Sequence, residues 1–507
     1  MAAVLAVDQA PASKSWVWPV VWAVLLSTLA LGQLMIGTDP AFTGLVVVFS
    51  AIWLVSVKLL GGPFTLMGAC IGFAGLQHIL ISQFAKLFMG QRPDAPLQQP
   101  IVTMQVYVLG MLGILLAAIL TRGKYLQGIK PVLSPEIRED RLRVLAYAMT
   151  FMMVIRYFGM SGIVPQARVL LQFDFVVPLA VACATAYTVV YSNRQKCLSP
   201  LTLFGVAVPL LFGIAFSQRR ESSYALVIFV ITAIAFGYKF KLWQIVGGAL
   251  VGAFFVYIIF PFALVARNTT RTASLTQSLS QSWEVLGDAI SNPGKFQEEA
   301  ARAPSLEDAA AWRVLYYGRP NPNLDRMSII ITTDSLVQAT ITRGTVGWET
   351  IVPGFEMVIP RAFNPDKEPV GTSNSIAQKA PGVVNDLDFV TSITLGFFLE
   401  SFLAFGWLGA FGLPFLMCLC YFVVYRIVMR QELRQNIWAC GMVVFLPWTF
   451  SEGTFQQNIV QVFQNGPLMA FVGLVIMVAV NSMSRSRNLQ AERVEDLPRE
   501  WKPVNAQ

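Results

Sequence analysis

Stretches of about 20 consecutive apolar residues recur along most of this 507-residue chain, and they constrain its fold more than any other feature. A helix that spans the hydrocarbon layer of a membrane needs a stretch of about this length. The composition agrees, since 55% of the residues are hydrophobic and only 13% are charged. We therefore expect an all-α polytopic membrane protein with about 12 transmembrane helices. The predicted spans lie near residues 17–37, 41–60, 63–84, 101–121, 142–160, 169–191, 201–217, 222–238, 242–265, 391–426, 436–451 and 459–482.

Two of these stretches have lengths that carry further information. The first is too long for the core of a signal peptide and has no small-residue cleavage site near its end, so we expect it to remain as the first span. The stretch at 391–426 is longer than one crossing requires. It predicts a short broken or re-entrant helix, kinked at Gly406 or Pro414, followed by a full span.

The basic residues gather in alternate loops, as topology determinants do, so the net charge of +8 does not indicate a nucleic-acid partner. With a cytoplasmic N-terminus, nearly every basic cluster falls on the cytoplasmic side, and the C-terminus lies there too. The predicted divisions are an N-terminal transmembrane bundle (1–266), a large outer loop (267–392), C-terminal transmembrane helices (393–482) and a cytoplasmic tail (483–507). The basic residues on the predicted cytoplasmic side are Lys58, Arg122, Lys124, Lys130, Arg138, Arg141, Arg194, Lys196, Lys239, Lys241, Arg426, Arg430, Arg434, Arg485 and Arg487.

The large outer loop carries aromatic residues and helical patterns, which distinguish it from a disordered linker. Apolar residues at helical spacing predict an amphipathic helix over 275–290 that lies along the membrane interface. A second helix is predicted from Asp325 to Thr342, followed by an ordered but irregular stretch rich in Pro and Gly. The loop has no cysteine, so no disulfide holds it together.

An arginine pair breaks the topology rule. Arg219 and Arg220, in the predicted tight turn SQRRES, face outward by parity, against the positive-inside bias. Arg156 lies roughly 20 Å along its helix from the cytoplasmic end, which also places it near the outer face. An arginine at membrane depth is costly and indicates a function. The alternatives are a headgroup anchor or ion pair for Arg219 and Arg220, and an internal salt bridge or carbonyl contacts for Arg156.

Further cations follow on the same side. Arg267 and Arg271 leave the predicted ninth helix, and Arg361 and Lys367 lie in the irregular stretch of the outer loop. A guanidinium group can donate two parallel hydrogen bonds to the oxygens of a phosphate, and lysine adds a point charge. These cations suit a lipid-linked diphosphate at the outer headgroup plane, and the alternative for Arg271 is an ordinary solvated surface role.

Two more residues could carry chemistry. The chain's only histidine, His78, is a candidate proton acceptor, with a histidine hydrogen-bonded between helices as the alternative. Glu400 stands in an otherwise apolar stretch and is either a general base or an ion-pair partner for the arginines. One histidine excludes a multi-histidine metal site, and no P-loop motif is present, so we expect no metal and no cofactor.

Three motifs and the architecture together resemble the O-antigen polymerase family, the oligosaccharide repeat-unit polymerases of bacterial polysaccharide assembly. The motifs are SQRRESS, VIPRAFNPDKEP and GFFLESFLAFGWLGAFG. Family members similarly carry an arginine in a small-residue turn, a PR followed by a PDK-like stretch, and an acidic residue before FG. The resemblance also covers the span count and the position of the large outer loop.

The resemblance implies a GT-C-like helical membrane glycosyltransferase in the bacterial inner membrane. Such an enzyme joins polyprenyl-diphosphate-linked (undecaprenyl-type) repeat units into O-antigen or exopolysaccharide at the periplasmic face, and a chain-length regulator is a possible partner. Arg219 or Arg220 matches the turn arginine that binds the diphosphate, assisted by Arg361 and Lys367, and Glu400 matches the acidic position. Preorganised cations there would stabilise the charge that develops on the leaving diphosphate.

Two other functions remain open. An O-antigen ligase differs only in its acceptor, but the histidine that related ligases carry in the outer loop is absent here. A transporter or flippase for a lipid-linked glycan usually shows matching halves with broken helices, and neither half of this chain resembles the other.

Overall fold

The computed structural model describes residues 17–122, 128–133, 139–160, 173–215, 219–259, 261–262, 266, 275–294, 316–317, 328–359 and 396–495. These residues form helices joined by short loops, and no β-strand occurs among them. Seven of the helices are long and apolar enough to cross a membrane, and four more are apolar but shorter. The chain is therefore an all-α, multi-pass membrane protein.

The helices follow the predicted spans closely. The first part of the bundle holds α1 (Val17–Met35), α2 (Pro40–Leu59), α3 (Leu66–Gly75), the π-helical turn η1 (Leu76–Leu80), α4 (Ile81–Phe88) and α5 (Pro100–Thr121). Its second part holds α7 (Glu139–Met160), α8 (Val176–Tyr191), α9 (Pro200–Ala215), α10 (Arg219–Ala235), α11 (Leu242–Phe254) and the π-helical turn η3 (Phe255–Ile259). The C-terminal part holds α20 (Phe397–Val428), α21 (Ile437–Met442), α22 (Phe445–Glu452), α23 (Phe455–Val460), the π-helical turn η5 (Gln461–Asn465) and α24 (Gly466–Glu495).

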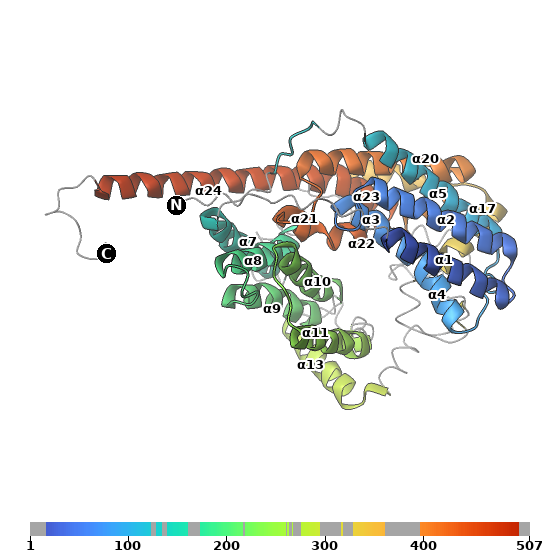
Figure 1. The fold of residues 1–507 in the computed structure, drawn as a ribbon, viewed down its shortest axis with the longest axis horizontal. Coiled ribbons are helices and arrows are strands. Elements are labelled where there is room, and N and C mark those ends of the chain that lie inside the picture. Colours follow the sequence, from blue (N-terminus) through green and yellow to red (C-terminus); the bar gives the residue numbers. More distant parts are fainter. Residues whose placement is uncertain are drawn as a thin grey trace.

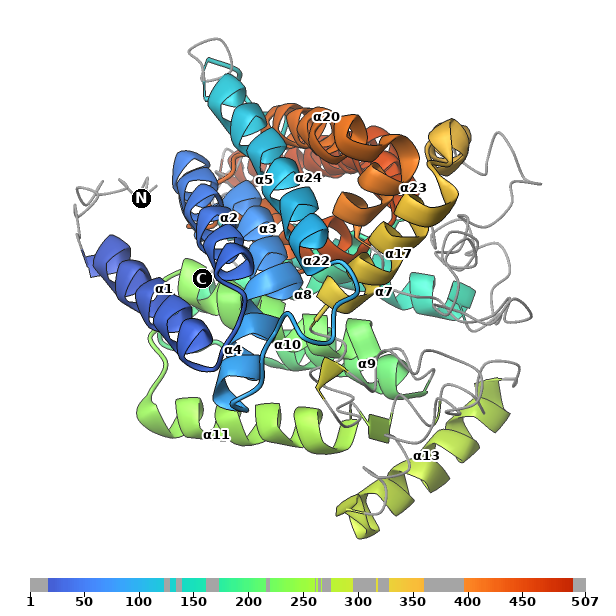
Figure 2. The same ribbon diagram turned by 90° about the vertical axis from the view of Figure 1, so that its right-hand side faces the viewer.

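Distant parts of the chain pack side by side. In Figures 1 and 2, α20 lies against α5, and α5 packs on α2, while α7 to α11 form a neighbouring group. Two glycines on α5 permit the close approach of α20. A methyl group on Gly113 would come within 2.5 Å of the carbonyl oxygen of Phe411, and one on Gly110 would overlap the ring of Phe398.

The loops with predicted cytoplasmic charges share one face of the bundle. The Leu66 amide donates to the carbonyl of Gln431 (2.8 Å), and the Leu133 amide donates to that of Val428 (2.9 Å). The Gln435 amide bonds the carbonyl of Ala235 at the end of α10 (3.2 Å). We call this face the basic face, since Lys58, Arg194, Lys196, Lys239, Lys241, Arg426, Arg430 and Arg434 lie in or beside these loops.

Several helices are interrupted inside the bundle. The kink predicted in α20 is confirmed at Gly406, where Phe405 and Gly406 leave helical geometry and Gly406 has φ +59°. The predicted span 436–451 is two short helices, α21 and α22, and the chain breaks again at Gly453 and Thr454 before α23. Such breaks free backbone groups inside the bundle, where other parts of the protein must bond them.

The described parts of the outer loop are helical. α13 (Leu275–Ser291) confirms the predicted amphipathic helix. It packs through Leu286 and Ala289 against η3 and α9, whereas Trp283 points outward. The second predicted helix is α17 (Ile330–Arg343), followed by η4 (Gly347–Thr350) and α18 (Val352–Glu356). α24 continues into the predicted tail as far as Glu495 and projects beyond the bundle (Figure 1).

Candidate functional site

Five buried polar residues gather where three interrupted helices meet. Gln77 and His78 lie on η1, Glu400 lies in the short first half of α20, and Ser451 and Glu452 end α22. Each is at most 8% exposed. We call these five residues the central cluster. Because burying polar groups is costly, their grouping at helix breaks marks the candidate site.

His78 bonds two groups on different helices. Its Nε2 lies 3.0 Å from the carbonyl oxygen of Ser451, and its Nδ1 lies 3.2 Å from the hydroxyl of Tyr107. A carbonyl oxygen only accepts, so we assign the ring proton to Nε2. Nδ1 then accepts from Tyr107. This arrangement matches the alternative reading of a histidine bonded between helices, and the proton-acceptor role stays a prediction.

The lack of a side chain at Gly396 leaves space for the ring of His78. Its backbone has φ +71°, in the region that favours glycine. A methyl group there would come within 2.5 Å of His78 Cε1 and 3.0 Å of the Ser451 carbonyl oxygen. The start of α20 is thus fitted directly against His78 and the end of α22.

Glu400 caps the break between α22 and α23. One carboxylate oxygen, Oε2, accepts a short hydrogen bond from the backbone amide of Phe455, the first residue of α23. The other, Oε1, is buried and has no hydrogen-bond partner among the described residues. A carboxylate suits a helix N-terminus, where partial positive charge collects. Glu400 therefore has one oxygen bonded to the backbone and one without a hydrogen-bond partner among the described residues.

Gln77 ties the cluster together. Its amide nitrogen donates to a carboxylate oxygen of Glu452, and its amide oxygen accepts from the hydroxyl of Ser451 at 2.7 Å. Glu452 is thus a second buried acidic group, in addition to Glu400. Glu452 was not identified as a site residue from the sequence. The signal was the polar run SEGTFQQN between two apolar stretches.

A branch of hydrogen bonds leads from the central cluster away from the basic face. The hydroxyl of Tyr107 on α5 lies 2.6 Å from that of Thr333 on α17. The neighbouring Asp334 accepts bonds from the amides of Gln98 (2.6 Å) and Gln99 (2.9 Å) and from Thr103 (2.9 Å). Burial raises the pKa of Asp334, and these three bonds offset part of that effect. The outer loop is fixed to the bundle at this point.

The arginine pair begins α10, at the level of the central cluster. Arg219 and Arg220 belong to the first turn of α10 and not to a tight turn, because the helix begins at Arg219 and not at the predicted residue 222. The end of α10 meets the start of α21 at the basic face, and further along Tyr224 packs on Trp448 of α22 with ring centroids 5.9 Å apart. α10 therefore runs antiparallel to the segment that α21 and α22 form. Arg220 is one turn before Tyr224, and Glu452 is one turn after Trp448, so the first turn of α10 lies level with Glu452. The side chains of the arginine pair lie outside the described residues.

Arg156 forms an ion pair, in agreement with the alternative prediction of an internal salt bridge. Its guanidinium lies 3.2 Å from a carboxylate oxygen of Asp174 and 5.9 Å from the ring centroid of Tyr157. Arg156 is buried while Asp174 is half exposed. The remaining predicted cations lie outside the described residues; they are Arg267, Arg271, Arg361 and Lys367.

An apolar groove of about 450 Å³ runs along the helix that carries His78. Beside it on α4, Lys86 is almost fully buried and donates to Gln91 at 2.9 Å. Its amine lies 4.7 Å from the ring centroid of Tyr316 in the outer loop. The groove is lined by Leu76, Leu80, Ile81, Phe84, Ala85, Phe88 and Met89.

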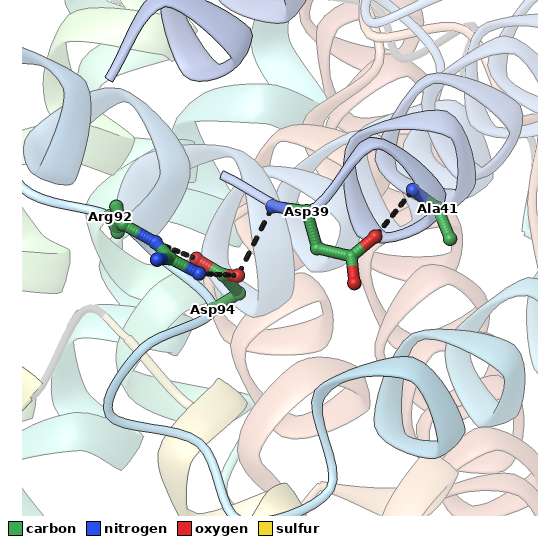
Figure 3. A network of polar contacts seen from close by, with 4 residues as sticks. All are labelled: Asp39, Ala41, Arg92 and Asp94. Atoms are coloured by element: carbon green, nitrogen blue, oxygen red, sulfur yellow. Dashed lines mark hydrogen bonds and ion pairs between the residues drawn. The ribbon is translucent and has the colours of Figure 1, made fainter. Parts of the chain in front are cut away.

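A polar network joins the loop after α4 to the start of α2. Arg92 and Asp94 form a two-contact ion pair (2.7 and 3.2 Å), and Asp94 also accepts from the amide of Asp39 at 3.1 Å (Figure 3). Asp39 in turn caps α2 through Ala41 (Figure 3). Burial acts to raise the pKa of Asp94, but the bonds from Arg92 and Asp39 outweigh it, so the pKa is lowered. This network holds the loop after α4 against the start of α2.

The described residues contain no group of three His, Cys, Asp or Glu side chains that could hold a metal ion. The central cluster offers two carboxyl groups, one imidazole, one hydroxyl and one amide. Comparisons with known protein families, curated proteins and solved structures find no match for this chain.

Proposed function

We propose that this chain polymerises polyprenyl-diphosphate-linked oligosaccharide repeat units into O-antigen or exopolysaccharide. It would act as a helical membrane glycosyltransferase of GT-C-like architecture, at the periplasmic face of the bacterial inner membrane. A growing chain on one lipid carrier is transferred to the non-reducing end of a repeat unit on another, and the polyprenyl diphosphate of the first carrier is released. The resemblance of its motifs to O-antigen polymerases motivates the proposal.

The observation that carries the proposal is the free oxygen of Glu400. A buried carboxylate with one oxygen fixed by a backbone amide and the other without a partner among the described residues is preorganised to accept a proton. In the proposed reaction it takes the proton of the acceptor hydroxyl as the hydroxyl oxygen bonds to the anomeric carbon. The central cluster also contains Glu452, level with the first turn of α10.

The arginine pair supplies the complementary charge. Breaking the glycosyl–phosphate bond leaves negative charge on the departing diphosphate, and guanidinium groups held at that position lower the barrier. Arg219 and Arg220 take this role, with Arg361, Lys367 and Arg267 assisting. Arg156 contributes less directly, because Asp174 already balances its charge. The apolar groove along the helix that carries His78 matches an isoprenoid chain in chemistry.

A second candidate is a transporter for lipid-linked glycans. The observation that favours it is the set of broken helices around the central cluster, since transporters place discontinuous helices at their binding sites. Polymerisation and transport differ in their product. A polymerase makes longer glycans, whereas a transporter moves unchanged repeat units across the bilayer.

The decisive test uses purified protein in liposomes with a synthetic polyprenyl-diphosphate-linked repeat unit. A ladder of lengthening glycans on a gel supports polymerisation, and R219A and R220A should each slow it by about 100- to 1000-fold. R430A is the matched control, because Arg430 is exposed on the basic face. Transbilayer movement of a labelled repeat unit without any ladder would contradict the proposal and favour the transporter.

A further inference from the structure

The outer-loop segment that η4 and α18 form exposes an apolar stripe. Helical backbone bonds continue along it: the Ile351 amide donates to the carbonyl of Trp348 at 2.9 Å. Further along, the Val358 amide donates to the carbonyl of Phe355 at 3.1 Å. Side chains three or four positions apart therefore share one side of the segment. We call one apolar side the outer stripe; its members, each between 46% and 62% exposed, are Trp348, Val352, Phe355 and Ile359.

Another side of the same segment packs on the candidate site. Thr350 and Gly354 are buried there. A methyl group on Gly354 would come within 2.9 Å of the Cα atom of Gln456, in the first turn of α23. Gln456 directly follows Phe455, whose amide bonds Glu400. The segment is therefore a wall of the bundle beside the break that Glu400 caps.

The outer stripe adjoins the exposed apolar surface of two spanning helices. At one end the ring of Trp348 lies edge-on to that of Phe405 on α20, with centroids 4.9 Å apart. At the other end the ring of Phe355 lies 6.1 Å from that of Phe463, within the span Phe455–Ala479. A spanning helix meets hydrocarbon with its exposed apolar side chains. On these two helices such side chains include Trp407, Leu408, Leu416, Phe463, Phe471 and Leu474.

The charged residues of the segment indicate its depth. Glu349 and Glu356 are exposed and lie seven positions apart, on a side next to the outer stripe. A charged side chain is costly in hydrocarbon, so this side faces water or lipid headgroups. Trp348 fits the same level, because tryptophan is enriched where the membrane meets water. An apolar side beside an acidic side is typical of a helix that lies along the bilayer surface.

We propose that residues 347–359 are inserted into the outer surface of the bilayer, with the outer stripe in contact with lipid acyl chains. Lipid is the partner that fits, because the stripe adjoins lipid-facing surface at both ends and the acidic side adjoins the stripe. The outer loop is then attached to the membrane where α23 begins. A lipid-linked substrate moving in the outer leaflet meets this segment next to Glu400, and that consequence alone rests on the proposed function.

Nitroxide labels on single introduced cysteines test the proposal in liposomes. The native cysteines are buried or partly buried, so the wild-type chain treated in the same way supplies the background signal. Oxygen concentrates in hydrocarbon, whereas a polar nickel chelate stays in water, and the ratio of their relaxation effects reports the surroundings of a label. We expect this ratio to be several-fold higher for V352C and F355C than for T342C, at the exposed end of α17.

Matched labels define both ends of the scale. L416C, exposed on the spanning helix α20, should have the high ratio, and E356C, on the acidic side of the same segment, should have a ratio near that of T342C. Ratios for V352C and F355C as low as that of T342C would place the outer stripe in water and overturn the proposal. Low accessibility to both reagents would show that protein covers the stripe, which overturns it equally. The labels report whether or not polymer forms, so absence of a glycan ladder would refute the proposed function alone.

Discussion

Replacing Glu400 separates a structural from a catalytic role for this residue. Its Oε2 accepts the amide of Phe455 at the start of α23, while its Oε1 has no hydrogen-bond partner among the described residues. E400Q keeps the shape of the side chain, and its amide oxygen still accepts from Phe455. E400A removes both oxygens and leaves the Phe455 amide without this partner. The two variants therefore differ in structure but lack the same proton acceptor.

The expected magnitudes follow from these contacts. A hydrogen bond to a charged group contributes about 1.5–3 kcal/mol and one to a neutral group about 1 kcal/mol, so E400Q should lower the free energy of unfolding by about 1 kcal/mol. E400A leaves a buried amide unpaired, which costs about 1–3 kcal/mol, and it adds a cavity. Loss of a general base costs about 100- to 10,000-fold in rate, so both variants should lose activity on that scale.

The assay combines two measurements on the same preparations. Thermal inactivation in detergent ranks stability, and the rate of ladder formation in liposomes measures activity. We expect a near-wild-type midpoint but little polymer for E400Q, and a lower midpoint with as little polymer for E400A. A stable E400Q that polymerises at the wild-type rate would show that Glu400 is only a helix cap, and the base would have to be sought elsewhere in the central cluster.

Three further predictions follow from the described contacts. G396A should cost about 1–3 kcal/mol, measured by thermal inactivation, because φ is +71° and the new methyl group would meet His78. G412A, where a methyl group meets nothing within 4 Å, should have no such cost. D94N should be less stable than wild type at neutral pH, because the pKa of Asp94 is lowered in the folded protein and its charged form therefore stabilises the fold at pH values above the ordinary pKa of 3.8. The difference in stability should disappear as the pH falls below 3.8 and Asp94 becomes protonated. A difference that stayed constant with pH would contradict this account. Cysteines placed at Lys196 and Arg430 should react with an impermeant maleimide from one side of the membrane and those at Gln98 and Thr342 from the other, and labelling of all four from one side would refute the topology.

Much of the fold is predictable because lipid imposes a simple length rule. A run of about 20 apolar residues identifies a spanning helix whatever it packs against. The alternate basic loops likewise predicted that widely separated segments share one face, and the bonds among Leu66, Gln431, Leu133 and Val428 confirm it. The rule failed at 436–451, where the run of apolar residues hides a break between two short helices.

The site was predictable only in part, because its contacts join distant segments. His78 and Glu400 were identified by their polarity in apolar surroundings, which is a local signal. Glu452 lies 375 residues from Gln77, its partner, and its polar run SEGTFQQN does not by itself distinguish a buried residue from one in a solvated loop. Tyr107 and Thr333 were missed for a related reason, since both residue types are common in spanning helices and become informative only once α5 and α17 are seen to meet.

The break at Gly453 and Thr454 connects the structure of the central cluster with its chemistry. A continuous helix there would satisfy its own backbone groups and leave no amide for Glu400. Because the chain breaks, the Ser451 carbonyl becomes the partner of His78 and the Phe455 amide that of Glu400, on opposite sides of the same short segment. His78 and Glu400 are thus both oriented by hydrogen bonds to one break in the backbone. A change that straightened this segment would misplace both at once, which explains why two buried titratable groups can be held in fixed positions in an otherwise apolar bundle.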